Sequence, residues 1–289
     1  MNSEATKIRT AIKFIKGHGT ENDFVLLPDA DGSLGERLDE SLVQRLTDRH
    51  AGIGADGVIR MARTESMPGY EDVAENAEWF MDYRNADGSL AEMCGNGVRV
   101  MARFLWESGW SAGPSLAIAT RGGVRTVHFE HDDRFTVEMG HAKPASTRQL
   151  AFVVAGGHTW PATSVSVPNP HAVVFVDDLT QPGRLAEPPE LRPAAAFPES
   201  ANVEFVVDRG AHHIALRVWE RGVGETRSCG TGVCAAAWAA MRRDGVGAGA
   251  TYAVDVPGGR LEVTERPDGE LLLTGPAVLG VRGKVHSML

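Results

Sequence analysis

The chain contains two short glycine-rich segments that resemble each other, and each begins with a cysteine. The first is Cys94-Gly95-Asn96-Gly97-Val98, and the second is Cys229-Gly230-Thr231-Gly232-Val233. They are separated by close to half of the chain, and each runs into an apolar, helix-forming stretch at residues 97–108 and 232–243. A repeat at this spacing predicts two similar halves, each with a helix that begins next to a cysteine.

Short apolar segments with strand character surround both predicted helices. We therefore predict an α/β fold of the α+β type, with two pseudo-symmetric domains that each wrap a curled, mostly antiparallel sheet around a central helix. The N-terminal half is expected to comprise residues 1–132 plus 270–289, and the C-terminal half residues 133–269. The proline-rich segment 180–200 is expected to be a surface excursion from the second half.

The composition is typical of a soluble globular protein, with 43% hydrophobic and 23% charged residues. The net charge of −9 argues against nucleic acid or an anionic membrane as a partner. No apolar run is long enough to span a bilayer, and the polar N-terminus does not resemble a signal peptide. We expect a cytoplasmic protein with reduced thiols, because three cysteines are too few for a disulfide scaffold in 289 residues.

A cysteine at the first turn of a helix lies in a special electrostatic environment. Backbone N–H groups there lack intrahelical partners and carry a partial positive charge, which lowers the pKa of a thiol and attracts carboxylates. Each motif therefore predicts one base and one anion cradle. Two motifs that face each other place a sulfur on each side of one carbon atom, as the inversion of a stereocentre requires. The third cysteine, Cys234, lies inside the second helix and is expected to serve packing alone.

Polar side chains lie at predicted turns and strand ends in both halves. Asn22 precedes a strand in the first half, and Asn169 of Pro168-Asn169-Pro170-His171 does so in the second. Asn85 begins a turn, Asn202 precedes a further strand, and the pair Glu220-Arg221 ends a strand ahead of Cys229. Each of these residues, taken singly, is typical of a turn or a cap. If they converge, they predict a site for the ammonium and carboxylate groups of an amino acid.

Taken together, these motifs resemble the diaminopimelate epimerase family, in the expected order and over nearly the whole chain. The resemblance is carried by seven blocks: Gly17-His18-Gly19…Asn22-Asp23-Phe24, Gly52-Ile53-Gly54-Ala55-Asp56, Asn85-Ala86-Asp87-Gly88-Ser89, Cys94-Gly95-Asn96-Gly97, Asn169-Pro170-His171, Glu220-Arg221-Gly222-Val223-Gly224-Glu225-Thr226 and Cys229-Gly230-Thr231-Gly232. It implies two α/β domains with the active site between them. It also implies conversion of LL-2,6-diaminopimelate to the meso form, for lysine and peptidoglycan synthesis, without pyridoxal phosphate, metal or nucleotide.

The resemblance also implies a role for each matching residue. Cys94 would remove the α-proton of the LL substrate and Cys229 would return a proton to the opposite face, with His171 and Glu220 tuning protonation. The substrate-binding set would be Asn22, Asn85, Gly95, Asn96, Asn169, Asn202, Glu220, Arg221, Gly230 and Thr231. Many relatives carry Gln after the aspartate of the Gly-Ile-Gly block, whereas this chain has Gly57, so a side-chain contact from that position is not implied. A homodimer acting on a small amino acid is expected.

Two alternatives stay open at the level of sequence. A proline or hydroxyproline racemase of the same fold also uses paired cysteines, although the asparagines and the Glu-Arg pair favour a longer diamino diacid. A non-catalytic amino-acid-binding or thiol-redox protein could use the same two sulfurs in a reversible disulfide. The letters of Gly52-Ile53-Gly54-Ala55-Asp56-Gly57 match a dinucleotide fingerprint, but a predicted helix rather than a strand precedes them.

Overall fold

The computed structural model describes residues 11–144 and 150–286, so the outermost residues of the predicted first half lie outside it. It contains three α-helices, α1 (Glu40–Thr47), α2 (Gly95–Glu107) and α3 (Gly230–Arg243), within those ranges. The strands are β1 (Ile12–Gly19), β2 (Asn22–Asp29), β3 (Gly57–Arg63), β4 (Trp79–Asn85), β5 (Ser115–Thr120), β6 (Gly123–Phe129), β7 (Arg134–His141), β8 (Lys143–Pro144), β9 (Ala151–Ala155), β10 (His158–Val167), β11 (Asn169–Phe175), β12 (Glu190–Arg192), β13 (Asn202–Gly210), β14 (His213–Glu220), β15 (Gly224–Thr226), β16 (Thr251–Val256), β17 (Gly259–Glu265), β18 (Glu270–Pro276) and β19 (Val278–Val285).

The two halves repeat one sheet topology, strand for strand. In the first half the strand order is β19-β1-β2-β3-β4-β5-β6-β7, with β2–β3 and β4–β5 parallel and the other pairs antiparallel. In the second half the order is β8-β10-β11-β13-β14-β16-β17-β18, with β11–β13 and β14–β16 parallel and the others antiparallel. The short strand β15 pairs with β14, and β9 and β12 form a small sheet with the start of β10. The predicted fold of two pseudo-symmetric, mostly antiparallel sheets is confirmed.

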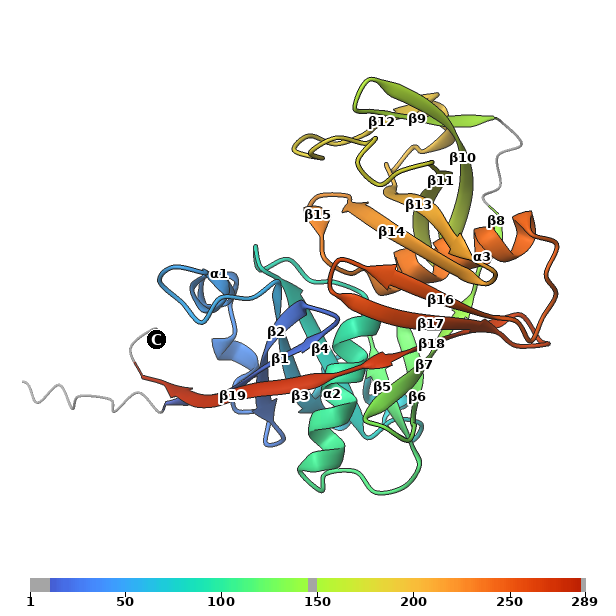
Figure 1. Ribbon diagram of the computed structural model, residues 1–289. Coiled ribbons are helices and arrows are strands. Elements are labelled where there is room, and N and C mark those ends of the chain that lie inside the picture. Colours follow the sequence, from blue (N-terminus) through green and yellow to red (C-terminus); the bar gives the residue numbers. More distant parts are fainter. Residues whose placement is uncertain (1–10, 145–149, 287–289) are drawn as a thin grey trace, which may run out of the picture.

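The halves also exchange strands. β7 and β18, which are equivalent strands of the two halves, pair antiparallel with each other. The strand that follows each of them then pairs with a strand of the opposite half: β8 with β10, and β19 with β1. Figure 1 shows β19 crossing from the second half to lie along β1. Because this pairing is continuous, the domain boundaries at 132/133 and 269/270 stay a prediction.

The two long helices lie at the centre of the two halves (Figure 1). Val98, Met101 and Leu105 of α2 are fully buried, as the apolar stripe predicts. α3 is buried on nearly all sides, and Cys234 packs there with 0% exposure. Residues of both helices belong to one continuous apolar cluster, so the core extends across the junction between the halves.

The helices begin two residues earlier than the sequence predicts. Cys94 and Cys229 have extended backbone angles, with φ −141° and ψ 114° at Cys94 and φ −126° and ψ 116° at Cys229. Each cysteine is therefore the residue that caps the helix, and the first glycine of each motif is already helical. Each helix therefore includes the glycines of its motif instead of beginning after them, and both sulfurs lie directly at a helix N-terminus.

The proline-rich segment 180–200 is only partly the surface excursion that we predicted. Leu185, Ala196 and Phe197 are buried in a second apolar cluster with residues of β11 and β13. The segment thus covers one side of the second sheet, because burial of its apolar side chains is favourable.

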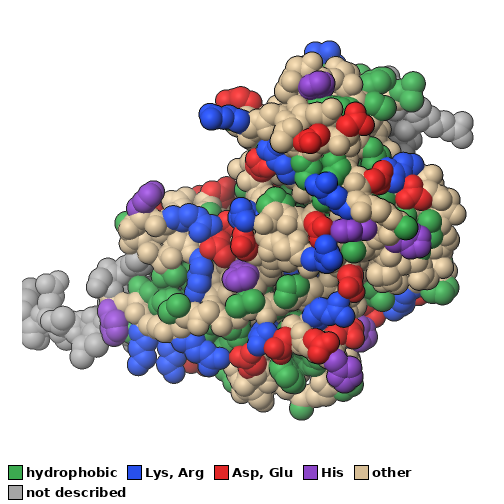
Figure 2. Space-filling model, in the orientation of Figure 1, with side chains coloured by type: hydrophobic (Ala, Val, Ile, Leu, Met, Phe, Trp, Pro, Cys, Tyr) green, Lys and Arg blue, Asp and Glu red, His purple; other side chains and the backbone are tan. Residues whose placement is uncertain are grey.

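Within the described residues, no helix is long and apolar enough to cross a membrane. Figure 2 shows charged side chains of both signs interspersed over the face in view, without a large patch of one sign.

Candidate functional site

The N-termini of α2 and α3 meet where the two halves adjoin. A Cβ atom built on Gly230 would lie 3.3 Å from Gly95 Cα and 3.6 Å from the Asn96 backbone nitrogen. The two helix starts are therefore in van der Waals contact, which leaves no room for side chains at these positions. The repeat predicted from the sequence thus brings Cys94 and Cys229 to one place.

Asn96 bridges the two halves behind the sulfurs. Its side-chain Nδ2 lies 3.2 Å from Asn22 Oδ1, from the Ser228 carbonyl oxygen and from Ser228 Oγ. The Cys94 thiol lies 3.5 Å from the same Asn22 oxygen and donates to it. Thr20 Oγ1 and Ser228 Oγ add a further hydrogen bond of 2.7 Å. Asn22 Oδ1 and Asn96 Nδ2 together thus connect Cys94 to Ser228, the residue that precedes Cys229.

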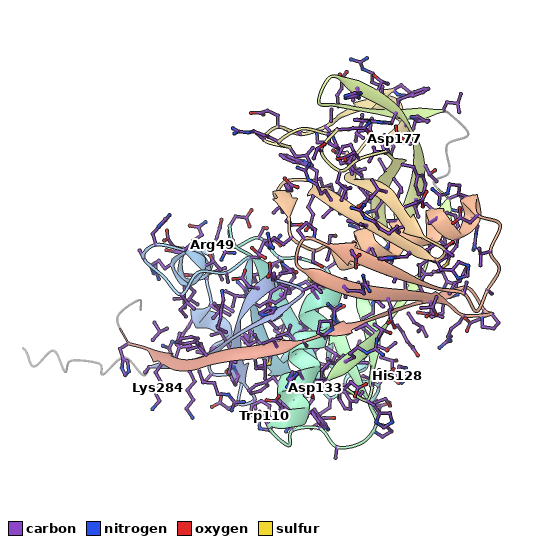
Figure 3. All side chains as sticks on the ribbon, in the orientation of Figure 1. Arg49, Trp110, His128, Asp133, Asp177 and Lys284 are labelled. Atoms are coloured by element: carbon purple, nitrogen blue, oxygen red, sulfur yellow. The ribbon has the colours of Figure 1, made fainter. Side chains whose placement is uncertain are left out.

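Asp56 fixes the orientation of Asn22. Asn22 Nδ2 donates to Asp56 Oδ2 at 2.7 Å, so Asn22 Oδ1 is directed at Cys94. Arg49, which Figure 3 labels near α1, bridges Asp56 and Asp23 with 2.8 Å contacts to each. Burial opposes ionisation of Asp23, but hydrogen bonds from Arg49 and Lys16 outweigh it and lower its pKa to about 2. This charged cluster holds the first-half side of the site in place.

Cys229 is surrounded by polar groups of the second half. Its Sγ lies 3.5 Å from Thr231 Oγ1 and 3.8 Å from Asn202 Nδ2, which donates to it. Glu220 hydrogen-bonds with the thiol and with the Thr226 hydroxyl. Only 7% of Cys229 is exposed, whereas Cys94 is partly exposed.

His171 is fully buried on β11 between two oxygens. Its Nδ1 lies 2.7 Å from Glu204 Oε1, and its Nε2 lies 3.0 Å from Asn169 Oδ1. Glu204 is also fully buried, and its second oxygen has no hydrogen-bond partner among the described residues. The ring is therefore held from both sides, by Glu204 at Nδ1 and by Asn169 at Nε2.

The pKa values of the two thiols contradict the expectation from helix position. Burial raises the pKa of Cys94 to about 11, although backbone N–H groups of Gly97 and Asn96 act to lower it. Burial and then the charge of Glu220 raise the pKa of Cys229 well above its usual range. Burial likewise raises the pKa of Glu220. The effect of the helix N-terminus on the thiol pKa has the predicted direction, but the loss of hydration on burial outweighs it at both sulfurs.

Two of the predicted binding residues are engaged elsewhere in this structure. Asn85 lies beside Gly57 in the β3–β4 pair, and its Nδ2 donates to Ser89 Oγ within its own turn. The Arg221 guanidinium donates to the Glu199 carbonyl at 2.7 Å and lines an open depression of about 570 Å³. Its backbone N–H, however, donates to Asn202 Oδ1 and so orients the amide that contacts Cys229.

Sequence reasoning missed several residues of this site, and some of them carry a detectable signal. Tyr83 is 8% exposed, and its pKa is raised by burial and by the charges of Cys94, Glu220 and Cys229. It lies two residues before Asn85 on β4, just as Glu204 lies two residues after Asn202 on β13, so strand periodicity could have placed both on the site's face. Nothing in the local sequence distinguishes Thr20 and Ser228, whose contact joins distant segments.

No group of three or more metal-ligating side chains occurs within residues 11–144 and 150–286.

Comparison with known proteins identifies the family. The diaminopimelate epimerase family model matches residues 14–144 and 163–280. The chain belongs to the diaminopimelate epimerase family. It is 54% identical over 284 residues to diaminopimelate epimerase of Streptomyces coelicolor, with 96% of each chain covered. It is 47% identical to the Thermobifida fusca enzyme of the same name, with 95% of this chain and 98% of that one covered. As a member of this family the chain is an isomerase.

A likeness in structure extends beyond the diaminopimelate epimerase family. A crystal structure of a hydroxyproline epimerase from Agrobacterium vitis superposes with a TM-score of 0.69 at 16% identity, over 97% of this chain and 94% of that one. At this identity the likeness shows a common fold alone.

Proposed function

We propose that the chain epimerises LL-2,6-diaminopimelate to meso-diaminopimelate, without a cofactor, for lysine and peptidoglycan synthesis. The observation that carries the proposal is the contact of two helix N-termini, each with a cysteine at its cap, in a member of the diaminopimelate epimerase family. A proline-type racemase would share the paired cysteines, but the similarity between this chain and such enzymes is limited to the fold.

In the proposed reaction the two sulfurs act on opposite faces of one carbon. The Cys94 thiolate takes the α-proton of the LL substrate, and the Cys229 thiol gives its proton to the other face. Each turnover removes one proton from the substrate and returns one. It leaves Cys94 as the thiol and Cys229 as the thiolate, which are the forms that the reverse reaction requires. The backbone N–H groups of Gly95, Asn96, Gly230 and Thr231 would donate hydrogen bonds to the carboxylate on the reacting carbon, where negative charge develops.

The raised thiol pKa values fit this chemistry. An α-proton of an amino acid is far less acidic than a thiol, so a base with a higher pKa abstracts it with less uphill transfer. The cost is a smaller population of thiolate, which neighbouring groups must offset. We propose that Glu220 and His171 tune protonation at the site: burial favours the neutral carboxyl of Glu220, which opposes a thiolate at Cys229 less than its charged form does, and His171 is hydrogen-bonded to Glu204.

The remaining polar side chains are proposed to hold the rest of the substrate. Asn22, Asn169 and Asn202 lie within hydrogen-bond reach of the catalytic groups and would orient the ammonium group. Asn85 and Arg221 would bind the distal centre after leaving Ser89 and Glu199, their partners in the substrate-free structure.

Substrate must reach a site in which Cys229 is buried and Cys94 is only partly exposed. We propose that the halves separate to admit it and close to exclude water, which strengthens the helix dipoles on the substrate. We further propose a cytoplasmic homodimer as the working form, and light scattering of the purified chain would measure the oligomeric state.

Proton NMR in deuterium oxide tests the proposed reaction. With LL-diaminopimelate, the α-proton signal should disappear in the presence of the wild-type chain under reducing conditions. Cys94→Ala and Cys229→Ala should each abolish this exchange, because removal and return of the proton need both sulfurs. Normal epimerisation by either variant would contradict the two-base assignment.

Cys234→Ala provides the matched control. This cysteine lies on the same helix as Cys229, but it is fully buried in packing and is not part of the proposed machinery. We expect its epimerisation rate to stay close to that of the wild type. Activity in an oxidised, disulfide-linked form would instead favour a thiol-redox function.

A further inference from the structure

Arg99 is a residue of α2 that the proposed mechanism does not use. It lies one turn after Asn96, and its exposed fraction is 0%. Its Nη2 donates to Asn96 Oδ1 at 2.9 Å, and its Nε donates to the Pro276 carbonyl at 3.3 Å. Its Nη1 has no hydrogen-bond partner in the part of the chain that the structure describes.

The environment of this guanidinium differs from that of an ordinary buried arginine. Arg60, the other deeply buried arginine, contacts the carboxylates of Asp29 and Asp82. Within residues 11–144 and 150–286 Arg99 forms no ion pair with a carboxylate. Burial lowers the pKa of its guanidinium to about 10, and the opposing influence comes from the thiols Cys94 and Cys234. Burying a charge without an opposite partner is costly, so packing alone does not account for an arginine here.

Glycines leave the space that the guanidinium fills. A Cβ atom on Gly19 would lie 3.0 Å from Arg99 Nη2, and one on Gly275 would lie 3.4 Å from its Cζ. Gly19 ends β1, and Gly275 lies near the end of β18, so both halves approach the guanidinium at positions without side chains.

A chain of hydrogen bonds connects the guanidinium to the reacting sulfur. Arg99 holds Asn96 Oδ1, which directs Asn96 Nδ2 to Asn22 Oδ1 and Ser228. The Cys94 thiol donates to that same Asn22 oxygen. The charge of Arg99 also acts on Cys94 directly and favours its thiolate, against burial and the charge of Glu220.

We propose that Arg99 is a positioning residue of the proton-transfer site, which fixes the Asn96 amide and supplies an unpaired positive charge that stabilises the anion at Cys94. Its role in turnover rests on the proposed function. Its effect on Cys94 is a property of the free protein and can be measured without any substrate.

The test uses the alkylation of Cys94 by iodoacetamide in a chain that carries Cys229→Ala and Cys234→Ala, so that one thiol remains. Because only the thiolate reacts, the dependence of the rate on pH reports the pKa of Cys94. We expect Arg99→Met to slow alkylation at neutral pH by about tenfold, the effect of one unit of pKa, with recovery of the rate at higher pH. Arg99→Lys keeps the charge and should stay within about threefold of the parent.

Arg103→Met is the matched control. Arg103 lies one turn further along α2 and donates to the neighbouring Ala277 carbonyl, but it is partly exposed and paired with Glu107. Its replacement should leave the alkylation profile unchanged. Coincident profiles for Arg99→Met and Arg103→Met would overturn the proposal.

If Arg99→Met does not fold, as judged by circular dichroism, Arg99→Lys decides alone. A rate within about threefold of the parent then supports the proposal, and a tenfold fall overturns it. The epimerisation rates of Arg99→Met and Arg99→Lys are measured separately, in chains that keep Cys229 and Cys234. A chain that shows the alkylation shift but never epimerises diaminopimelate would refute the proposed function while leaving the charge effect of Arg99 intact.

Discussion

At the scale of single residues, the site places its bases where ionisation is costly. Cys94, Cys229 and Glu220 each have a raised pKa, and in each case burial is the largest cause. The folded protein therefore prefers these groups in their neutral forms, and it resists their ionisation more strongly than the unfolded chain does. This preference links the stability of the fold to pH.

The first prediction concerns stability in alkali. The folded pKa of Cys94 is about 11, above its usual value of 9.0, so between these values the unfolded chain releases a proton that the folded chain retains. The free energy of unfolding should therefore fall as pH rises through this window, by about 2 kcal/mol from Cys94. Urea denaturation under reducing conditions at several pH values measures the slope.

Cys94→Ser supplies the comparison, because serine does not titrate in this range. The fall between pH 9 and 11 should be shallower in the variant, although Cys229 and Cys234 still contribute in the same direction. Parallel curves for the variant and the wild type would show that the thiol of Cys94 is not protected from ionisation.

At the scale of secondary-structure elements, the close approach of two helix starts is the central feature. Gly230 faces Gly95 across the junction, and a Cβ atom there would meet Leu273 Cδ2 at 3.2 Å and Gly95 Cα at 3.3 Å. The leucine side chain can shift, but the backbone of the opposite helix cannot yield without moving a catalytic cysteine.

Gly230→Ala should therefore impair the reaction more than the fold. We expect the epimerisation rate to fall by at least about tenfold, because small displacements of reacting groups are costly in rate. The loss of stability should be about 1 kcal/mol, typical of modest overpacking. NMR exchange and thermal unfolding measure the two effects.

Gly247→Ala tests whether this effect is specific to the junction. Gly247 lies between α3 and β16, and a Cβ atom there would have no neighbour within 4 Å. Its rate should match that of the wild type. Equal losses for both variants would show that helix contact at Gly230 does not control the chemistry.

The sequence predicts the elements well because their signals are local. The repeated Cys-Gly motif marks both helix starts to within two residues, and apolar periodicity marks the strands around them. Which strands pair across the two halves is not a local property. The predicted first half included residues 270–289 and so β19, but local signals do not give the pairing of β19 with β1 or of β8 with β10. For the same reason the motif identifies Cys94 and Asn96, whereas the link from Arg99 to Pro276 depends on segments far apart in the chain.

At the scale of the whole molecule, the two halves share one sheet and one core, whereas the proposed reaction requires them to separate to admit the substrate. The hydrogen bonds of Asn96 and Thr20 to Ser228 and the ion pair between Arg227 and Glu21 cross that junction. They are among the contacts that opening would break, and the strands β7 and β18 would remain paired as the hinge region.

The last prediction is a change of shape on binding. Small-angle scattering should give a smaller radius of gyration with diaminopimelate than without it, because the ligand favours the closed form. L-Alanine, which lacks the second amino acid centre, serves as the control ligand and should have a weaker effect. Scattering is recorded without ligand, with diaminopimelate and with L-alanine, and the alkylation rate of Cys229 is compared in the same conditions. Identical scattering curves together with an unchanged alkylation rate would contradict closure.

The strand β19 also has a consequence for biosynthesis of the chain. It pairs with β1, so residues 278–285 complete a sheet that began at residue 12. During translation the N-terminal portion emerges from the ribosome long before its edge partner has been made. A domain built from one continuous stretch of sequence can fold as soon as that stretch has emerged. Here the edge of the first half at β1 stays unpaired until the second half and β19 have been synthesised.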